Sequence, residues 1–273
     1  MLEKIIHGDG QRFAPEAGEE APMAEQFARL QYLVEHCDLS EKKVLDCGCG
    51  TGYSLPIVAA NFPTGHYVGI DMEKGAIDYA RQRYKNLHFA VMNGRCLAFS
   101  PSCFDVVLSF EVLEHLSKKQ QEEYVREMHR VLKPDGMIIL STPNKEVFSL
   151  GYENSLNLYH IAERTLSELS KLLGETFASM EIYGQYFDGE DLRRKDKLQI
   201  ESKFTLKKRM KRYAIRWIIN SPIAKPAYDM YEATKAKVLG KRKVYPFEIS
   251  ASDFKFDKTH LDDSKWFFCV CRK

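Results

Sequence analysis

Short runs of apolar residues alternate with helical stretches from residue 43 to residue 183. β-Branched and aromatic residues are frequent in each run, and a turn signal or a more polar stretch separates it from the next. Five runs are predicted as strands: KVLDCGC (43–49), HYVGIDM (66–72), LHFAVMN (87–93), FDVVLSF (104–110) and GMIILSTP (136–143). Alternation of strands and helices is typical of βαβ units, so the pattern predicts a mostly parallel sheet covered by helices.

The helices and the later strands follow the same rules. The segment KKQQEEYVREMHRVLK (118–133) places its apolar residues at helical spacing. It stops at Pro-Asp-Gly (134–136), which combines a helix breaker with a turn signal. A further helix and two further strands are predicted over 164–174, 177–187 and 265–273. We therefore predict a doubly wound α/β fold.

Composition agrees with a folded globular protein. Hydrophobic residues make up 44% of the 273 residues and charged residues 29%, so the chain can form a core and lacks the low hydrophobicity typical of disorder. No uninterrupted apolar run of about 18 residues, the length of a membrane-spanning helix, occurs in the sequence. Near the N-terminus, Lys4 is not followed by the apolar run that a signal peptide requires. We expect a cytoplasmic protein that is neither secreted nor membrane-spanning.

The seven cysteines stand at irregular positions, which favours free thiols in a reducing compartment over a disulfide framework. Cys269 and Cys271 are separated by one residue, unlike the two-residue spacing of common zinc and redox motifs. From the sequence we expect structural thiols and assign no metal-ligating residues.

The net charge of +2 conceals a basic segment. Residues 193–243 hold 17 Lys and Arg against 4 Asp and Glu, so the remaining chain holds 23 (40 − 17) against 34 (38 − 4). Within this segment, TLKKRMKRYAIRWII (205–219) predicts a basic amphipathic helix. Either its apolar stripe docks on the main domain as a lid, or the helix lies on an anionic membrane surface. Nucleic acid is a less favoured partner, because no RNA-binding motif accompanies the charge.

A glycine-rich turn follows the first predicted strand. Residues 46–52 read Asp-Cys-Gly-Cys-Gly-Thr-Gly, and glycines let the backbone turn tightly where a ligand approaches. Ligands of open parallel sheets bind at this end of the strands, and amides of the following helix can receive an anionic group. Asp71 ends the second predicted strand, 21 residues after Gly50, where a carboxylate can accept hydrogen bonds from both ribose hydroxyls of a nucleoside. Loop and acid together predict an adenosine-type ligand.

Four segments in this order resemble the motifs of the class I S-adenosylmethionine-dependent methyltransferases. They are VLDCGCGTGYS (44–54), VGIDMEKGAIDYAR (68–81), FDVVLSFEVLEHL (104–116) and RVLKPDGMIILSTPN (130–144). The resemblance covers residues 43–144 almost without a gap. It implies S-adenosyl-L-methionine as the cofactor. It also implies a seven-stranded Rossmann-like sheet whose last strand is antiparallel. The length of the segment between the last two predicted strands indicates a helical insertion there.

The resemblance also implies which residues bind the cofactor. They are Asp46, Gly48, Gly50 and Gly52 in the loop, Asp71 and Met72 after the second strand, Asn93 and Gly94 after the third, and Phe110 after the fourth. In this resemblance Asp46, Gly48 and Gly50 face the methionine part of the cofactor. Asp71 binds the ribose, and Met72 packs on the adenine. Phe110 and Glu111 border the sulfonium and the substrate. Asn93 stands where the family often has Asp, and its amide oxygen can still accept a hydrogen bond from the adenine amino group.

Methyl transfer needs a nucleophile held in line with the sulfonium methyl group, and a hydroxyl nucleophile benefits from a base within roughly 2.6 to 3.2 Å. Candidate bases are Glu111, Glu114, His115 and His160. For Glu114 we favour a structural polar contact, because Glu-His-Leu at this place is frequent in the family. The catalytic candidates are therefore His160, Glu111 and His115.

Residues 153–169, together with Gly184 and Gln185, resemble a subgroup of these methyltransferases that accompanies bacterial glycan biosynthesis. The subgroup pattern is Asn-Pro-Phe-His followed by an acid. Here Leu158 replaces the proline, and the acid is Glu163.

Glu25 and Arg29 lie four residues apart on a predicted N-terminal helix. Two interpretations remain open for this pair. The side chains form an exposed i,i+4 ion pair, or, as in the subgroup, they belong to a helix that closes over the cofactor.

The expected domains are an N-terminal helical cap (1–42), a catalytic domain that binds S-adenosylmethionine (43–187), a basic helical insertion (188–264) and the last strand of the catalytic sheet (265–273). An insertion of this length exceeds a plain loop, so we expect it to carry helices. The expected function is O-methylation of a sugar or glycan acceptor, including a lipid-linked one. The alternatives are methylation of a quinone or other lipid precursor, and a cofactor-binding protein without catalysis.

Overall fold

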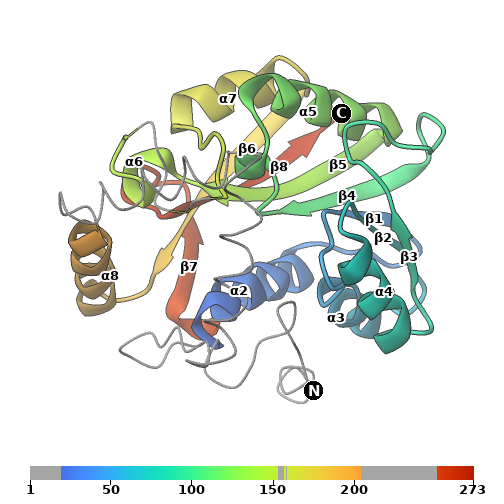
Figure 1. The fold of residues 1–273 in the computed structure, drawn as a ribbon, viewed down its shortest axis with the longest axis horizontal. Coiled ribbons are helices and arrows are strands. Elements are labelled where there is room, and N and C mark those ends of the chain that lie inside the picture. The colour runs from blue at the N-terminus through green and yellow to red at the C-terminus, as the bar shows by residue number, and fades with distance from the viewer. Residues whose placement is uncertain (1–19, 153–156, 158, 204–250) are drawn as a thin grey trace, which may run out of the picture.

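The structure is a computed structural model that describes residues 20–152, 157, 159–203 and 251–273 (Figure 1). Its helices are α2 (Glu20–His36), α3 (Ser54–Asn61), α4 (Lys74–Arg83), α5 (Lys118–Val131), α6 (Lys145–Phe148), α7 (Leu166–Gly174) and α8 (Glu190–Lys203), with short 3₁₀ helices η1 (Leu113–His115) and η2 (Ala251–Asp253). Its strands are β1 (Lys43–Cys47), β2 (His66–Asp71), β3 (His88–Val91), β4 (Phe104–Phe110), β5 (Leu132–Pro143), β6 (Ser179–Phe187), β7 (Phe254–Asp257) and β8 (Trp266–Arg272).

The strands form one sheet in the order β3-β2-β1-β4-β5-β8-β6-β7. The first five of these are parallel to one another. β8 lies antiparallel between β5 and β6, with Leu140 opposite Cys269 on one side and Ile182 opposite Cys269 on the other. The predicted doubly wound α/β fold with an antiparallel last strand is confirmed.

The sheet has eight strands where the sequence predicted seven. The additional strand, β7, pairs antiparallel with β6 at the edge and falls inside the segment predicted as a helical insertion. Its sequence FKFD alternates apolar and polar residues, the period of a half-buried strand. Phe254 packs on Phe187 at a ring distance of 4.7 Å, whereas Lys255 is exposed. A run of four residues is too short to be distinguished from a loop by its pattern of apolar and polar residues alone.

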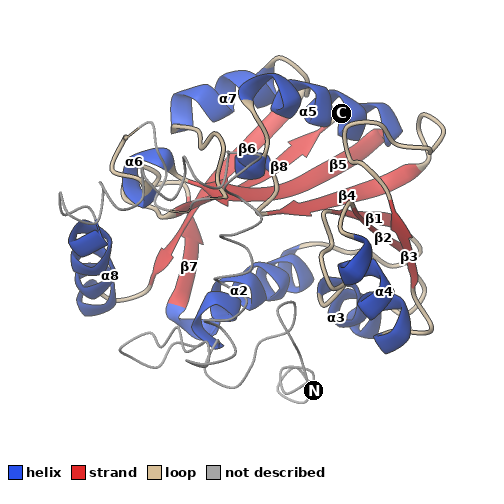
Figure 2. Ribbon diagram, in the orientation of Figure 1, coloured by secondary structure: helices blue, strands red, loops and turns tan. Residues whose placement is uncertain are grey.

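Helices cover both faces of the sheet (Figure 2). One apolar core joins α5 and α7 to the strands, with Tyr124, Met128 and Leu172 among its buried residues. The other core joins α2, α3 and α4 to the opposite face, with Leu30 and Ile77 fully buried. The carboxyl ends of the parallel strands are therefore held rigidly between two packed layers.

The predicted turn at 134–136 is instead an irregular part of β5. Helix α5 ends at Val131, and β5 begins at the next residue. Phe104 pairs with Leu132, and Val106 pairs with Met137. Between these two pairs, β4 has one residue, whereas β5 has four. The extra residues, which include the Pro-Asp-Gly sequence, form a bulge, a common device that bends a strand without ending it.

The predicted basic helix over 205–219 lies outside the described residues. The first described part of the expected insertion forms the helix α8 (Glu190–Lys203). Among the described helices, none has the length and apolar character that crossing a bilayer requires.

Candidate active site

The glycine-rich loop after β1 is built from left-handed backbone. Gly48, Gly50 and Gly52 have φ angles of +86°, +54° and +77°, a region that side-chain-bearing residues rarely adopt. The amides of Gly48 and Cys49 donate to the carbonyl of Ile70 at 2.8 and 2.9 Å, which ties the loop to β2. A Cβ on Gly48 would approach Val112 Cγ2 to 2.4 Å, whereas a Cβ on Gly50 would meet nothing within 4 Å. The loop thus leaves open space beside Gly50.

Asp71 lies at the same end of the sheet and contacts the loop. Its Oδ2 accepts from the amide of Gly50 at 2.9 Å, and its Oδ1 accepts from the amide of Glu73 at 2.8 Å. A carboxylate offers about four acceptor positions, so two remain for ribose hydroxyls. Met72 and Val91, at the ends of β2 and β3, are 63% and 46% exposed, which leaves apolar surface beside Asp71. These features fit a nucleoside.

The other predicted cofactor residues differ in exposure and contacts. Asp46 is buried and accepts a hydrogen bond from Ser54, and burial raises the pKa of its carboxyl to about 7 despite that bond. The amide oxygen of Asn93 accepts from the amide of Arg95 at 3.0 Å, so any adenine contact would have to share that oxygen. A Cβ on Gly94 would come within 2.5 Å of the Tyr124 ring, which indicates a packing role for this glycine.

Arg29 of α2 is fully buried, so the interpretation of an exposed ion pair with Glu25 is wrong. Its Nε donates to Gln185 Oε1 at 2.6 Å, and its Nη1 lies 3.2 Å from Glu111 Oε1. The guanidinium also lies over the Trp266 ring at 5.5 Å. Neither Nη atom has a hydrogen-bond partner among the described residues. Apart from the ion pair of Nη1 with Glu111, both Nη atoms can still donate hydrogen bonds, and they fit the carboxylate of the cofactor's methionine part.

Glu111 follows β4 in left-handed backbone, with φ of +57°. Such strain in a residue other than glycine is frequent at functional sites. Ser141 Oγ donates to Glu111 Oε1 at 2.9 Å, and the amide of Glu111 donates to the carbonyl of Ser141. Phe110, one residue earlier, stacks on Phe268 at 6.3 Å and is half-buried. The carboxylate of Glu111 is thus held between Arg29 and the end of β5.

His160 is buried and supported from two sides. Its Nδ1 lies 2.6 Å from Glu163 Oε1, while Ser149 Oγ donates to Glu163 Oε2 at 2.5 Å. The ring stacks on Phe148 at a centroid distance of 5.3 Å. Because the Glu163 carboxylate accepts the Nδ1 hydrogen, Nε2 is the nitrogen that carries the lone pair. The acid that the sequence placed after this histidine therefore orients its ring.

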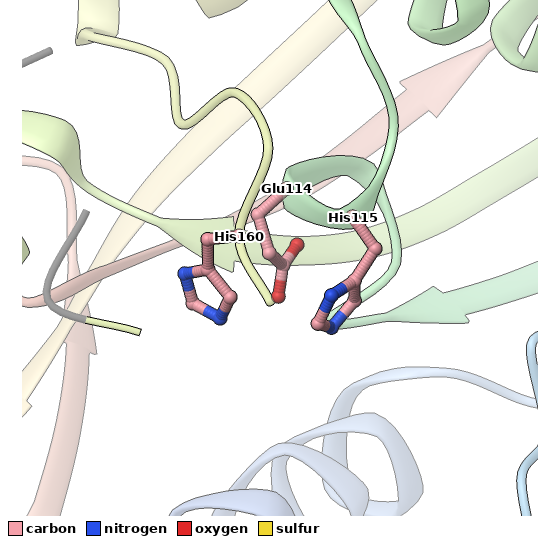
Figure 3. Close-up of side chains that lie close together, drawn as sticks. All are labelled: Glu114, His115 and His160. Atoms are coloured by element: carbon pink, nitrogen blue, oxygen red, sulfur yellow. The ribbon is translucent and has the colours of Figure 1, made fainter. Parts of the chain in front are cut away.

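His115 and Glu114 lie next to His160 (Figure 3). The two imidazole rings are 5.1 Å apart, and the carbonyl of Tyr159 accepts from His115 Nδ1 at 3.1 Å. Although His115 as a whole is exposed, desolvation of its ring by neighbouring groups lowers its pKa, while Glu111 and Asp71 oppose that shift. Glu114 is buried, which raises the pKa of its carboxyl well above the usual range. The structure brings all four candidate bases to one place.

Gln121 of α5 explains why these segments meet. Its amide nitrogen lies within hydrogen-bond distance of three carbonyls, those of Leu113, Leu116 and Ala162. The carbonyl of Glu114 in turn accepts from the amides of Ile161 and Ala162. The sequence analysis missed Gln121. Its signal was a polar residue on the buried stripe of α5, at the position where the helical pattern calls for an apolar one.

A pocket of 690 Å³ lies between α6, α8 and the loop before β8. Its lining combines the aromatic rings of Tyr186 and Phe187 with charged side chains, among them Glu190, Arg193, Arg194 and Asp262.

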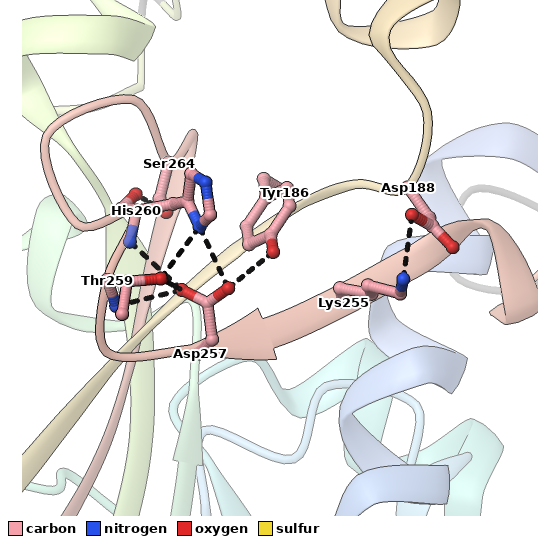
Figure 4. Close-up of polar contacts among 7 residues, drawn as sticks. All are labelled: Tyr186, Asp188, Lys255, Asp257, Thr259, His260 and Ser264. Carbon is pink, nitrogen blue, oxygen red and sulfur yellow. Dashed lines mark hydrogen bonds and ion pairs between the residues drawn. The ribbon is translucent and has the colours of Figure 1, made fainter.

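Asp257 holds one wall of this pocket in place. Its carboxylate accepts hydrogen bonds from the side chains of Tyr186 and Thr259 and lies 2.9 Å from His260 Nδ1 (Figure 4). Burial would raise the pKa of Asp257, but the hydrogen bonds from Tyr186 and His260 together hold it below its usual range. α6 reaches both sites, because its Phe148 stacks on His160.

Lys265 and Asp196 form a buried ion pair at the edge of this pocket, with Nζ 2.6 Å from Oδ1. Lys265 also lies over the Trp266 ring at 4.7 Å. Sequence reasoning missed this pair, because its members are far apart in the chain and each stands in an unremarkable polar stretch.

Comparison with known proteins agrees with this geometry. A family model described as a methyltransferase domain matches residues 38–208. A probable S-adenosylmethionine-dependent methyltransferase of Mycolicibacterium smegmatis is 34% identical over 143 residues, covering 52% of this chain and 53% of the relative. A ubiquinone biosynthesis O-methyltransferase of Neisseria meningitidis is 34% identical over 123 residues, covering 43% of this chain and 50% of the relative. The chain spans about half the length of these curated relatives.

Solved structures share the fold at low sequence identity. The YcgJ protein from Bacillus subtilis has a TM-score of 0.55 at 16% identity and covers 90% of this chain and 98% of its own. An S-adenosylmethionine-dependent methyltransferase from Archaeoglobus fulgidus has a TM-score of 0.54 at 13% identity, covering 91% and 94%. With the family match over residues 38–208, more than half of the chain, and the loop, acid and strand order above, the chain belongs to the class I S-adenosylmethionine-dependent methyltransferases, and S-adenosyl-L-methionine is its cofactor.

Proposed function

We propose that the protein transfers a methyl group from S-adenosylmethionine to a hydroxyl oxygen of a sugar or glycan, including a lipid-linked one. The observation that carries this proposal is the pocket beside α6, whose lining mixes aromatic rings with acids and bases. A polyhydroxylated acceptor offers donors and acceptors to such a lining and apolar faces to its rings.

The proposed reaction is an in-line methyl transfer. The acceptor oxygen attacks the methyl carbon in line with the sulfonium sulfur, the carbon–sulfur bond breaks, and the sulfur keeps the electron pair. The acceptor's proton must also leave, and His160, His115 and Glu111 are the proposed candidates for the base, with the two imidazole rings 5.1 Å apart. The products are a methyl ether, S-adenosylhomocysteine and a proton.

A second candidate acceptor is a quinone or other lipid precursor. It is favoured by the 34% identity to the ubiquinone biosynthesis O-methyltransferase of Neisseria meningitidis. One experiment distinguishes the glycan acceptor, the quinone or lipid acceptor, and the alternative of a protein without catalysis. The protein is incubated with cofactor labelled in the methyl group and with separate pools of nucleotide sugars, lipid-linked glycans and polyphenolic quinone precursors. We expect label in a glycan pool, whereas label in the quinone pool alone would favour the second candidate, and no label in any pool would favour the non-catalytic one.

Asp71→Ala should weaken S-adenosylmethionine binding by roughly 1.5 to 3 kcal/mol, because it removes charge-assisted contacts to the ribose. Calorimetric titration of the folded variant measures this. Asp78→Ala is the matched control, since its carboxylate lies on α4, pairs with exposed Lys74 and is not one of the predicted cofactor residues. Equal affinity of both variants for the cofactor would contradict the role of Asp71.

For the basic segment at 205–219 we propose a lid, with the protein in the cytoplasm. Protease cleavage within 193–243 should then slow when cofactor and acceptor are both present, and sedimentation with vesicles should be negligible. A peripheral contact with the inner membrane surface predicts the reverse. The protein would sediment with anionic vesicles at low salt and release as ionic strength rises, because surface charges are screened over roughly 10 Å at 0.1 M salt.

A further inference from the structure

Three side chains that can ligate a metal converge at the ends of β4 and β5. Figure 3 shows the carboxylate of Glu114 between the rings of His115 and His160. One potential ligand atom from each residue lies within 4.8 Å of the other two. Residues 114 and 115 come from η1 and residue 160 from the loop after α6. The cluster is therefore assembled by the tertiary fold.

Glu114 adds an independent observation. Its side chain is 1% exposed, and Thr142 Oγ1 donates to Oε2 at 3.1 Å. The other oxygen, Oε1, is buried and has no hydrogen-bond partner among the described residues. A buried carboxylate oxygen without a partner is costly. Since the carboxylate is aimed at the two imidazoles, the missing partner belongs between them.

Both histidines are prepared as ligands by groups behind them. The carbonyl of Tyr159 accepts from His115 Nδ1, and Glu163 accepts from His160 Nδ1. The lone pair of each ring is thus on Nε2. A hydrogen bond from the second ring nitrogen to a carboxylate or a backbone carbonyl is the usual support of metal-ligating histidines.

We propose that Glu114, His115 and His160 bind one divalent transition-metal cation, of the type of Mn²⁺, Co²⁺ or Zn²⁺. Two imidazoles with one carboxylate suit these ions better than Ca²⁺ or Mg²⁺, which prefer oxygen ligands. Tetrahedral metal bonds of about 2.1 Å hold ligand atoms about 3.4 Å apart. The three ligand atoms lie within 4.8 Å of one another, so the side chains must close by at most about 1.4 Å around the cation.

The role of the cation rests on the proposed function. Three protein ligands leave coordination positions open for the acceptor hydroxyl, as in catalytic metal sites. A cation there lowers the pKa of that hydroxyl, so its oxygen becomes a better nucleophile toward the methyl group. His160 then holds the cation instead of accepting the proton.

The test uses the full chain, freed of metal with a chelator and without cofactor or acceptor. Co²⁺ is titrated while its visible absorption is followed, and Zn²⁺ binding is measured by calorimetry. We expect one equivalent of each ion in the unaltered protein. Glu114→Gln and His115→Ala should bind at least about 10-fold more weakly, and so should Glu163→Gln, which acts through His160. His66→Ala, an exposed histidine at the start of β2, is the matched control and should bind normally.

Two results would overturn the site: no saturable binding by the unaltered protein, or equal binding by His115→Ala. His115 is exposed, so this variant should fold even if Glu114→Gln does not. Failure of the site and failure of the proposed function are distinguishable. Cation binding without methyl transfer to any hydroxyl acceptor would leave the site and refute the function, whereas undiminished transfer by the chelated protein would refute the site and leave the function.

Discussion

Replacing His160 by alanine should lower the rate of methyl transfer by about 10²-fold or more, while the affinity for S-adenosylmethionine stays nearly unchanged. The ring is within 5.1 Å of His115 and oriented by Glu163, so its removal takes away either a base or a cation ligand from the acceptor side of the site. The predicted cofactor contacts come from the ends of β1 to β4 and do not involve this loop. Initial rates at saturating cofactor, with calorimetry of cofactor binding, measure the two effects separately.

His66→Ala serves as the control, since this histidine is exposed at the opposite end of the parallel strands. Because His160 stacks on Phe148 and is buried, circular dichroism of the variant must first establish that it is folded. Full activity in a folded His160→Ala protein would show that His160 has a structural role and takes no part in catalysis.

Arg29→Met should weaken cofactor binding by about 3 kcal/mol, or about 150-fold. The two Nη atoms of Arg29 have no hydrogen-bond partner among the described residues, and we expect them to bind the cofactor's carboxylate. Methionine keeps most of the length of the side chain and its packing on Trp266, but it removes the charge. Calorimetric titration with S-adenosylmethionine gives the change in affinity.

The same substitution should change the free energy of unfolding of the cofactor-free protein far less. Loss of the hydrogen bond to Gln185 and of the ion pair with Glu111 destabilises the fold. The desolvation penalty of the fully buried guanidinium disappears at the same time, and the Glu111 side chain, which is 21% exposed, can be solvated without its partner. Lys74→Met, an exposed lysine paired with Asp78, is the control for both measurements. A cofactor affinity equal to that of the control would show that the buried guanidinium is purely structural.

The sequence was a good guide wherever a feature depends on neighbours in the chain. The five parallel strands, the loop at 46–52 and the acid at the end of β2 follow from local periodicity and turn chemistry. Helix α7 begins with a capping box in which Thr165 and Glu168 satisfy each other's backbone amides. Gly174, where this helix ends, fits the predicted boundary.

Features that depend on distant residues were harder to predict. The pattern around Glu114 indicated only a structural contact, because nothing local shows that its Oε1 will be buried beside residue 160. The burial of Arg29 depends on Gln185, 156 residues away. The bulge in β5 was read as a turn, since Pro-Asp-Gly has the same local preferences in both settings. Long-range contacts decide such cases, and one sequence does not display them.

The position of β8 has a consequence for how the chain folds during its synthesis. This strand, residues 266–272, lies in the interior of the sheet and joins β5 to β6, which otherwise have no pairing with each other. On the ribosome, β1 to β5 can assemble early and β6 can pair with β7, but this pair can join the rest of the sheet only after residue 272 has emerged from the exit tunnel. Until then β5 presents an unpaired edge, which is prone to pair with other chains. Slow translation within the basic segment would prolong the time for which the edge of β5 is exposed, so the nascent chain is most in need of a chaperone at that stage.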